Sequence, residues 1–221
     1  MNLAIRSVAV DNAWVAQQET AGVSRPRGKR LPAETRRHQL LDTAAHLLVT
    51  RGIDALTMEA VAQEAGTSKT LGYAYFENSG HLVASLRARE LRSLYQRLKA
   101  ATEGLESFDH RVAAAVHAYF DTVAEKGMLL ARLNEAVSAR HIETDDSDGT
   151  YEFLSWLATV VDDEFGVGRR LSRSYAAVIS DAANSHARLL ATGRYRRAEI
   201  EERCVRFVLA GVRSALSAGL S

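Results

Sequence analysis

The apolar residues of this chain recur mostly at intervals of three and four, which is the spacing along one face of an α-helix. The first such stripe lies between Glu34 and Arg51, and Gly52 directly after it can take the left-handed conformation that ends a helix. Its apolar members are Leu40, Leu41, Ala44, Ala45, Leu47 and Leu48. The pattern predicts a first amphipathic helix from Glu34 to Arg51.

Two very short helical segments follow, and a three-residue turn separates them. They are Met58–Ala65 and Lys69–Tyr75, and the turn between them contains Gly66. The hydroxyls of Thr57 and Ser68 can cap the two helices, and the glycine can end the first one. Two helices joined by about three residues including glycine are typical of a helix-turn-helix.

The rest of the chain is also predicted to be helical, because its two prolines, at positions 26 and 32, both precede the first helix. A fourth helix is expected from Ser79 to about Ala101, with Leu82, Leu86 and Leu94 buried on one side. Longer helices are then expected over residues 108–125, 128–140, 149–165, 169–192 and 196–218. The breaks between them are predicted at Gly104, at Gly127, over Glu143–Gly149, over Gly166–Gly168 and at Gly193. The predicted fold class is all-α.

The lengths of the apolar runs, the N-terminal pattern and the cysteine content indicate where in the cell the protein is found. No apolar run approaches the roughly 20 residues that a bilayer span needs, and residues 1–24 do not have the pattern of a secretory signal. The single cysteine, Cys204, allows no internal disulfide, and its helical spacing favours a place in the core. We expect a cytoplasmic protein with no membrane segment, no cofactor and no metal site.

Charge is distributed unevenly along the chain, although its formal net value is only +1. Residues 1–105 contain 14 basic and 10 acidic side chains, a net of +4, and residues 106–221 have a net of −3. The basic excess is densest just before and within the start of the first helix. There Arg25, Arg27, Lys29, Arg30, Arg36 and Arg37 are opposed only by Glu34. Such a concentration of cations can neutralise DNA phosphates, although a solvated tail would have the same composition.

From Leu40 to Leu82 the sequence resembles the DNA-binding domain of the TetR family of transcriptional regulators. The residues that carry the resemblance are Leu41-x-x-Ala44-Ala45-x-x-Leu48, Gly52, Thr57-Met58, Val61-Ala62-x-x-Ala65-Gly66-Thr67-Ser68-Lys69 and Tyr73-x-Tyr75-Phe76. Residues 1–33 are expected to form a flexible basic arm, because Gly22, Pro26, Gly28 and Pro32 interrupt them and their apolar residues show no sustained period. The resemblance implies a three-helix helix-turn-helix domain over residues 34–82, linked through a helix to about residue 101. It also implies a helical ligand-binding and dimerisation domain over residues 83–221.

The resemblance further implies which residues contact double-stranded operator DNA. In family members the third helix enters the major groove, and its neighbours hold the phosphates. Carried over by position, and with the basic arm included, the expected contacts are Arg25, Arg27, Lys29, Arg30, Thr57, Ser68, Lys69, Thr70, Tyr73, Tyr75 and His81. Phe76 matches a buried position. Gly72 stands where the family usually has leucine, so the recognition helix is expected to be repacked or somewhat loose here.

The resemblance also implies a homodimer, and residues about 169–218 are expected to form its interface. One apolar stripe there contains Leu171, Tyr175, Val178, Ile179, Ala182, His186 and Leu189, and a second contains Ile200, Cys204, Phe207, Val208, Gly211, Ala215 and Leu216. Such stripes can also face the domain's own core. The family keeps a cavity for a small effector before these helices. The expected ligand-binding residues are His117, Tyr119, Phe120, Asn134, Tyr151, Trp156, Asn184 and Arg188.

The sequence thus predicts a DNA-binding regulator, a repressor that a small and mostly hydrophobic effector releases from its operator. One alternative is a DNA-bound regulator or scaffold controlled by a protein partner. A second alternative, an enzyme, finds little support, because no catalytic motif is present and Gly166-Val167-Gly168 is a lone G-x-G. No catalytic residues are therefore assigned.

Overall fold

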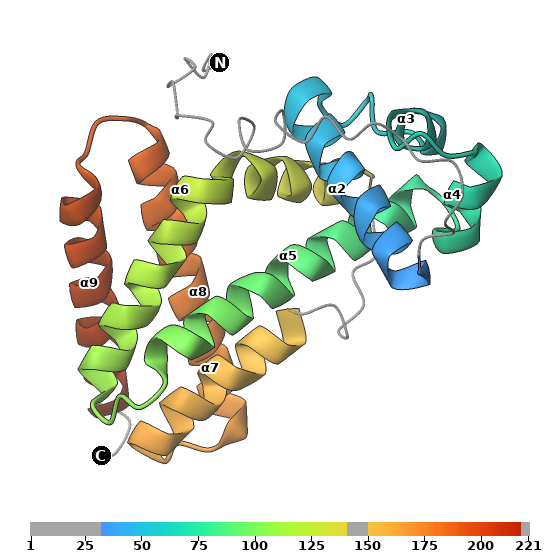
Figure 1. Ribbon diagram of the computed structural model, residues 1–221. Helices are drawn as coiled ribbons and strands as arrows, with labels where there is room; N and C mark the ends of the chain where they lie inside the picture. The colour runs from blue at the N-terminus through green and yellow to red at the C-terminus, as the bar shows by residue number, and fades with distance from the viewer. Residues whose placement is uncertain (1–31, 141–149, 218–221) are drawn as a thin grey trace. The chain divides into compact units, whose positions relative to one another are not determined.

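The computed structural model describes residues 32–140 and 150–217, and all regular secondary structure in these ranges is helical (Figure 1). The helices are α2 (Ala33–Arg51), α3 (Met58–Glu64), α4 (Lys69–Tyr75), α5 (Ser79–Thr102), α6 (Phe108–Arg140), α7 (Thr150–Phe165), α8 (Arg169–Ala191) and α9 (Arg197–Ser217). The all-α prediction is confirmed. The predicted bounds agree with these to within one residue everywhere except in α6.

The predicted break at Gly127 is wrong, because α6 continues through it to Arg140. Glycine inside a helix costs about 1 kcal/mol relative to alanine. Beyond Gly127, however, Leu129, Leu133 and Ala136 are at most 3% exposed and belong to a hydrophobic cluster. Burying a single leucine side chain contributes about 1.5–3 kcal/mol, so packing outweighs the local preference for a break.

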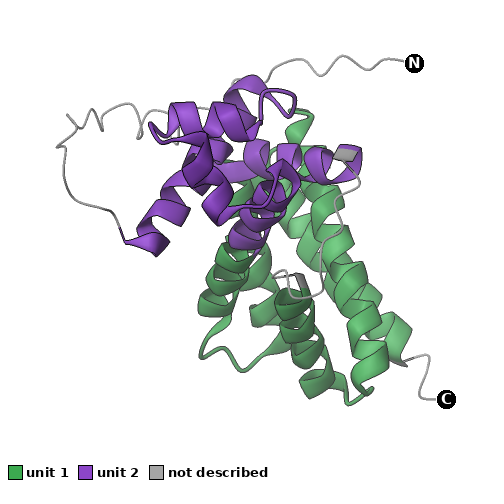
Figure 2. Cartoon of the chain, turned by 90° about the vertical axis from the view of Figure 1, so that its right-hand side faces the viewer, with its two compact units in different colours: residues 1–11, 92–124, 149–221 green, residues 12–91, 125–148 purple. Residues whose placement is uncertain are grey.

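The chain divides into two compact units (Figure 2). Among the described residues, unit 2 contains residues 32–91 and 125–140, and unit 1 contains residues 92–124 and 150–217. Helices α5 and α6 each contribute to both units. The helix-turn-helix region therefore shares a compact unit with the second part of α6, which lies far from it in the sequence.

The core of unit 2 is built from the stripe predicted for the first helix. The six apolar residues of α2 named above are fully buried. They belong to one cluster with Met58 and Val61 of α3, Phe76 after α4, and Leu82 and Leu86 of α5. Phe76 is 1% exposed, as its expected structural role requires. Helices α3 and α4 therefore pack on this cluster.

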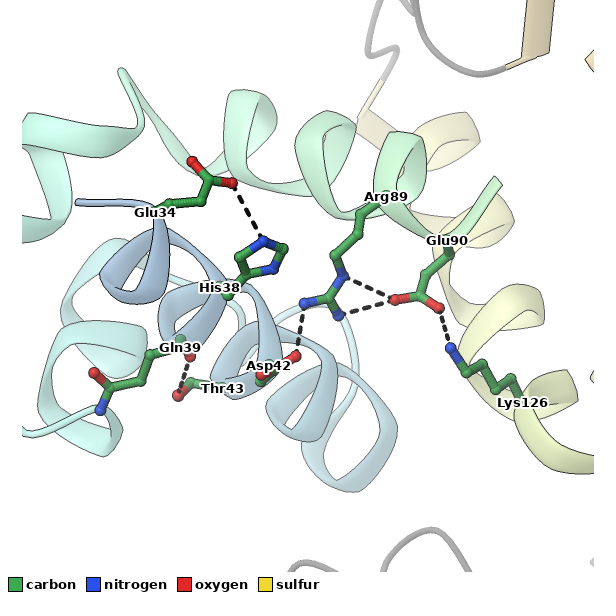
Figure 3. Close-up of polar contacts among 8 residues, drawn as sticks. All are labelled: Glu34, His38, Gln39, Asp42, Thr43, Arg89, Glu90 and Lys126. Carbon is green, nitrogen blue, oxygen red and sulfur yellow. Dashed lines mark hydrogen bonds and ion pairs between the residues drawn. The ribbon is translucent and has the colours of Figure 1, made fainter. Parts of the chain in front are cut away.

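A chain of ion pairs connects three helices of unit 2 at a buried carboxylate (Figure 3). Glu90 of α5 is 4% exposed, and its carboxylate lies 2.8 Å from Lys126 Nζ of α6 and 2.9 Å from a guanidinium nitrogen of Arg89. Arg89 also donates to Asp42 of α2 at 2.6 Å. Because the buried carboxylate has two cationic partners, its charge is compensated. The chain joins α2 to α5 and α6 beside the apolar core.

Unit 1 is a helical bundle with its own core. Apolar residues of α6, α7 and α9 form its main cluster, whose fully buried members include Phe120, Val161, Ile200 and Cys204. The Gly166–Gly168 segment is the turn between α7 and α8, and both of its glycines have positive φ. No helix within residues 32–140 or 150–217 is long and apolar enough to cross a membrane.

Candidate DNA interface and effector site

The predicted turn between α3 and α4, residues Gly66 to Ser68, is here called the elbow, and hydrogen bonds fix its conformation. The Thr57 hydroxyl accepts from the Ala60 amide at 3.1 Å, and the Ser68 hydroxyl accepts from the Leu71 amide at 3.2 Å. Gly66 adopts a φ of 63°, where a residue with a side chain is disfavoured. Its amide bonds to the Gln63 carbonyl, and the next amide bonds to the Ala62 carbonyl, which is a Schellman ending. The angle between α3 and α4 is thus set locally.

Gly72 is buried on α4 and lies beside Met58 of α3. A Cβ atom at this position would lie 3.3 Å from the terminal methyl of Met58, which is itself 4% exposed. The helix is nevertheless uninterrupted from Lys69 to Tyr75. Met58 of α3 fills the space beside the glycine.

Six of the predicted contact residues in the described part of the chain fall into three groups. Lys69, Thr70 and Tyr73 are exposed on α4, and Tyr73 is 45% exposed. Thr57 and Ser68 are also exposed, with their hydroxyl oxygens engaged as helix caps. Tyr75 is half-buried and packs against the core of unit 2.

His81, the last of the predicted contacts, lies at the start of α5. It is exposed, its Nδ1 lies 3.3 Å from the Glu77 amide nitrogen, and its ring packs edge-on against Phe76 at 5.8 Å. Its own amide donates to the Asn78 side chain, which caps the helix at 2.8 Å. The four predicted arm residues, Arg25, Arg27, Lys29 and Arg30, lie outside the described residues.

Two contacts of this surface were not predicted. Glu59 of α3 forms an ion pair with Lys69, and the Lys69 ammonium also lies 5.8 Å from the centre of the Tyr73 ring. The pair lowers the pKa of Glu59 and raises the pKa of Lys69, in each case chiefly through the hydrogen bond between them. Arg37 of α2 lies over the Phe76 ring at 5.3 Å. Both contacts join residues on different elements, which helical periodicity does not relate.

Four of the predicted effector residues of unit 1 form two separate pairs. The Tyr119 hydroxyl of α6 donates to the Asn184 side chain of α8 at 2.7 Å. Burial raises the pKa of Tyr119 to about 12, so the hydroxyl stays protonated and remains a donor. The nearby positive charge of Arg188 acts in the opposite direction. This pair is a polar contact within an apolar surrounding.

The second pair lines a surface pocket of about 580 Å³. Its walls are Tyr95 of α5 and Tyr151, Glu152, Ser155, Trp156 and Thr159 of α7. The Tyr95 and Trp156 rings meet edge-on at 5.9 Å, and the Arg173 guanidinium lies 4.9 Å from the centre of the Tyr151 ring. The pocket therefore offers aromatic faces together with one carboxylate.

The remaining predicted effector residues lie elsewhere. Phe120 is fully buried in the main core of unit 1. His117 is exposed on α6, with Nδ1 3.2 Å from the Glu201 carboxylate. Asn134 is exposed and belongs to unit 2, so it does not share a compact unit with the others. Cys204 is buried as expected, and burial raises the pKa of its thiol to about 11.

The fold and this surface define a helix-turn-helix protein. Residues 40–86 match the family of bacterial regulatory proteins named tetR. The chain is 35% identical over 107 residues to the HTH-type transcriptional activator FasR of Mycolicibacterium smegmatis, covering 48% of each chain. It is 34% identical over 85 residues to the HTH-type transcriptional regulator BetI of Brucella anthropi, covering 38% of this chain and 44% of BetI. The matches thus span about half the length of these curated relatives.

Solved structures share the fold over most of the chain. A tetR-family transcriptional regulator from Streptomyces coelicolor aligns with a TM-score of 0.63 at 23% identity, over 85% of this chain and 84% of that one. The fatty acid degradation regulator FadR from Bacillus halodurans aligns with a TM-score of 0.59 at 15% identity, over 82% and 97%. These structures show the same fold, and the match to the tetR family covers residues 40–86.

Proposed function

We propose that the chain is a DNA-binding transcriptional regulator that inserts α4 into the major groove of operator DNA. The observation that carries the proposal is the closed elbow at Gly66, which holds α4 on the core of unit 2 with Lys69, Thr70 and Tyr73 exposed. A seven-residue helix supported in this way can enter a major groove, which is about 12 Å wide.

The exposed side chains suit two kinds of DNA contact. Lys69 is a flexible cation that can reach a phosphate or a guanine edge, and the Tyr73 hydroxyl can donate to a phosphate. The basic residues before α2 add phosphate contacts or reach the adjacent minor groove, where arginine responds to groove width. Phosphate contacts supply affinity, and contacts to base edges supply the choice of operator.

The chain acts as a homodimer through α8 and α9. Both helices bury one side in the core of unit 1 and leave large apolar side chains on the other. Leu171, Val178 and Leu189 of α8 are 43–61% exposed, and Phe207 of α9 is 60% exposed. Gly211 and Ala215, which permit close approach, are exposed on the same helix as Phe207. A second copy of the chain would cover these residues in a four-helix interface.

A small and mostly hydrophobic effector controls binding from unit 1. The aromatic pocket between Tyr95, Tyr151 and Trp156, together with the partly buried Tyr119–Asn184 hydrogen bond, supports this assignment. The effector favours a dimer geometry that does not fit the operator, so DNA and effector bind with opposing preference. The regulator is a repressor under this scheme. A reporter gene that is less active when the regulator is deleted would assign activation instead, the activity named for FasR.

Substitution of Lys69 tests the DNA contact directly. Lys69→Gln is expected to weaken binding to a selected operator fragment and to reduce the salt dependence by about one phosphate contact. Lys99→Gln is the matched control, because Lys99 is an exposed lysine in the last turn of α5. Equal affinities and equal salt slopes for the wild type and both variants would contradict the assigned role of Lys69.

A further inference from the structure

On the helix-turn-helix surface, the Lys69 ammonium forms an ion pair with a carboxylate of the same motif. Between Thr57 and Phe76 the sequence contains one basic residue, Lys69, and two acidic ones, Glu59 and Glu64. Glu64 forms an ion pair with Arg51 at the end of α2. Glu59 is therefore the carboxylate that pairs with Lys69, and the pair joins α3 to α4 across the elbow.

The position of Glu59 does not depend on Lys69 alone. The pKa of Glu59 is lowered first by the hydrogen bond from Lys69 and next by a backbone hydrogen bond from its own residue. Glu59 also lies in the first turn of α3, where the helix favours negative charge. These two interactions continue to stabilise the carboxylate when Lys69 moves away.

The pair is open to solvent, with 53% of the Lys69 side chain and 57% of the Glu59 side chain exposed. Exposed ion pairs are weak, and breaking one changes an equilibrium constant by about two- to fivefold. A DNA phosphate can therefore displace the carboxylate. When this happens, the Glu59 carboxylate is left unpaired beside the DNA and attracts a cation from the solution. The uptake of this cation offsets part of the release of counterions from the DNA.

We propose that Glu59 is an internal competitor of DNA phosphate for the Lys69 ammonium and thereby limits the affinity of the chain for DNA. Glu59 acts through Lys69 and is a positioning residue. Its effect is to keep the complex weak enough for a change elsewhere in the protein to release it. This inference rests on the proposed function.

The test compares two charge-removing substitutions on the same helix. Glu59→Gln frees Lys69, whereas Glu64→Gln removes an equal charge from α3 and leaves the Glu59–Lys69 pair intact. Both full-length variants are titrated with a random-sequence duplex and with a selected fragment at several salt concentrations. Thermal melting of each variant checks that the fold is retained.

Glu59→Gln is expected to bind both duplexes about two- to fivefold more tightly than Glu64→Gln does. Its salt slope should be steeper by about 0.9, which changes relative affinity about threefold between about 50 and 200 mM salt. In a Lys69→Gln background, Glu59→Gln should have no larger effect than Glu64→Gln has. A gain that persists without Lys69 would overturn the inference.

The remaining outcomes are also decisive. Equal behaviour of Glu59→Gln and Glu64→Gln, or weaker binding by Glu59→Gln, would overturn the inference while leaving DNA binding intact. A wild-type chain that binds neither duplex would overturn the proposed function, and the inference with it.

Discussion

The close packing of Gly72 against Met58 gives a prediction whose sign follows from the structure. Glycine inside a helix is about 1 kcal/mol less favourable than alanine, so Gly72→Ala gains approximately this amount in α4. The new methyl would lie 3.3 Å from Met58 Cε, a few tenths of an ångström inside an ordinary contact. Methionine has three rotatable bonds and its terminal methyl can move aside. We expect a net stabilisation of about 0.3–1 kcal/mol.

Ala74→Gly is the matched control for this prediction. Ala74 is exposed on the same helix, so its replacement measures the cost of glycine in α4 without a change in packing. The difference between the Gly72→Ala gain and the Ala74→Gly loss is then the cost of moving Met58.

Hydrogen–deuterium exchange over residues 58–76 and thermal melting of the full chain are suitable measurements. Gly72→Ala should slow exchange and raise the melting temperature, and Ala74→Gly should do the opposite. A loss of more than about 1 kcal/mol in Gly72→Ala would refute the reasoning, because it would mean that Met58 cannot yield.

Two further substitutions test the dimer and the buried ion pairs. Phe207→Asp is expected to convert the dimer to monomers in analytical ultracentrifugation, whereas Met128→Asp, at a residue 54% exposed on α6, should leave it dimeric; monomeric wild type would contradict the proposed interface. Glu90→Leu removes the shared partner of Lys126 and Arg89 and should lower the free energy of unfolding by about 2 kcal/mol, less than for fully buried charges because both cations are partly exposed. Adding Lys126→Met should restore part of that loss in urea denaturation. A double variant no more stable than Glu90→Leu alone would show that the loss does not come from the unpaired Lys126.

The helices and the elbow could be predicted because their signals are local. Each signal depends on residues that are close together in the sequence. They are an apolar stripe with a period of 3.6, a capping hydroxyl such as that of Thr57, and a glycine in the left-handed region such as Gly66. The prediction at Gly127 failed because a local preference was opposed by burial of Leu129 and Leu133 in a core assembled from distant segments.

The contacts across elements could not be predicted in the same way. The carboxylate of Glu90 meets Lys126 only because α5 and α6 come together in unit 2, and Glu59 meets Lys69 only because the elbow has its particular angle. For the effector residues, the expected set was drawn from the apolar and polar character of the region. The structure places Tyr119 and Asn184 in one hydrogen bond and lines a separate pocket with Tyr151 and Trp156.

The central claim is that the elbow at Gly66 presents α4 to duplex DNA. Selection of bound fragments from genomic DNA by the purified full-length chain tests this most directly. The account predicts enrichment of fragments with two related half-sites about 10–10.5 base pairs apart, or one helical turn, as a two-fold dimer requires. Failure to prefer any duplex at moderate ionic strength, with and without added metabolites, would contradict it.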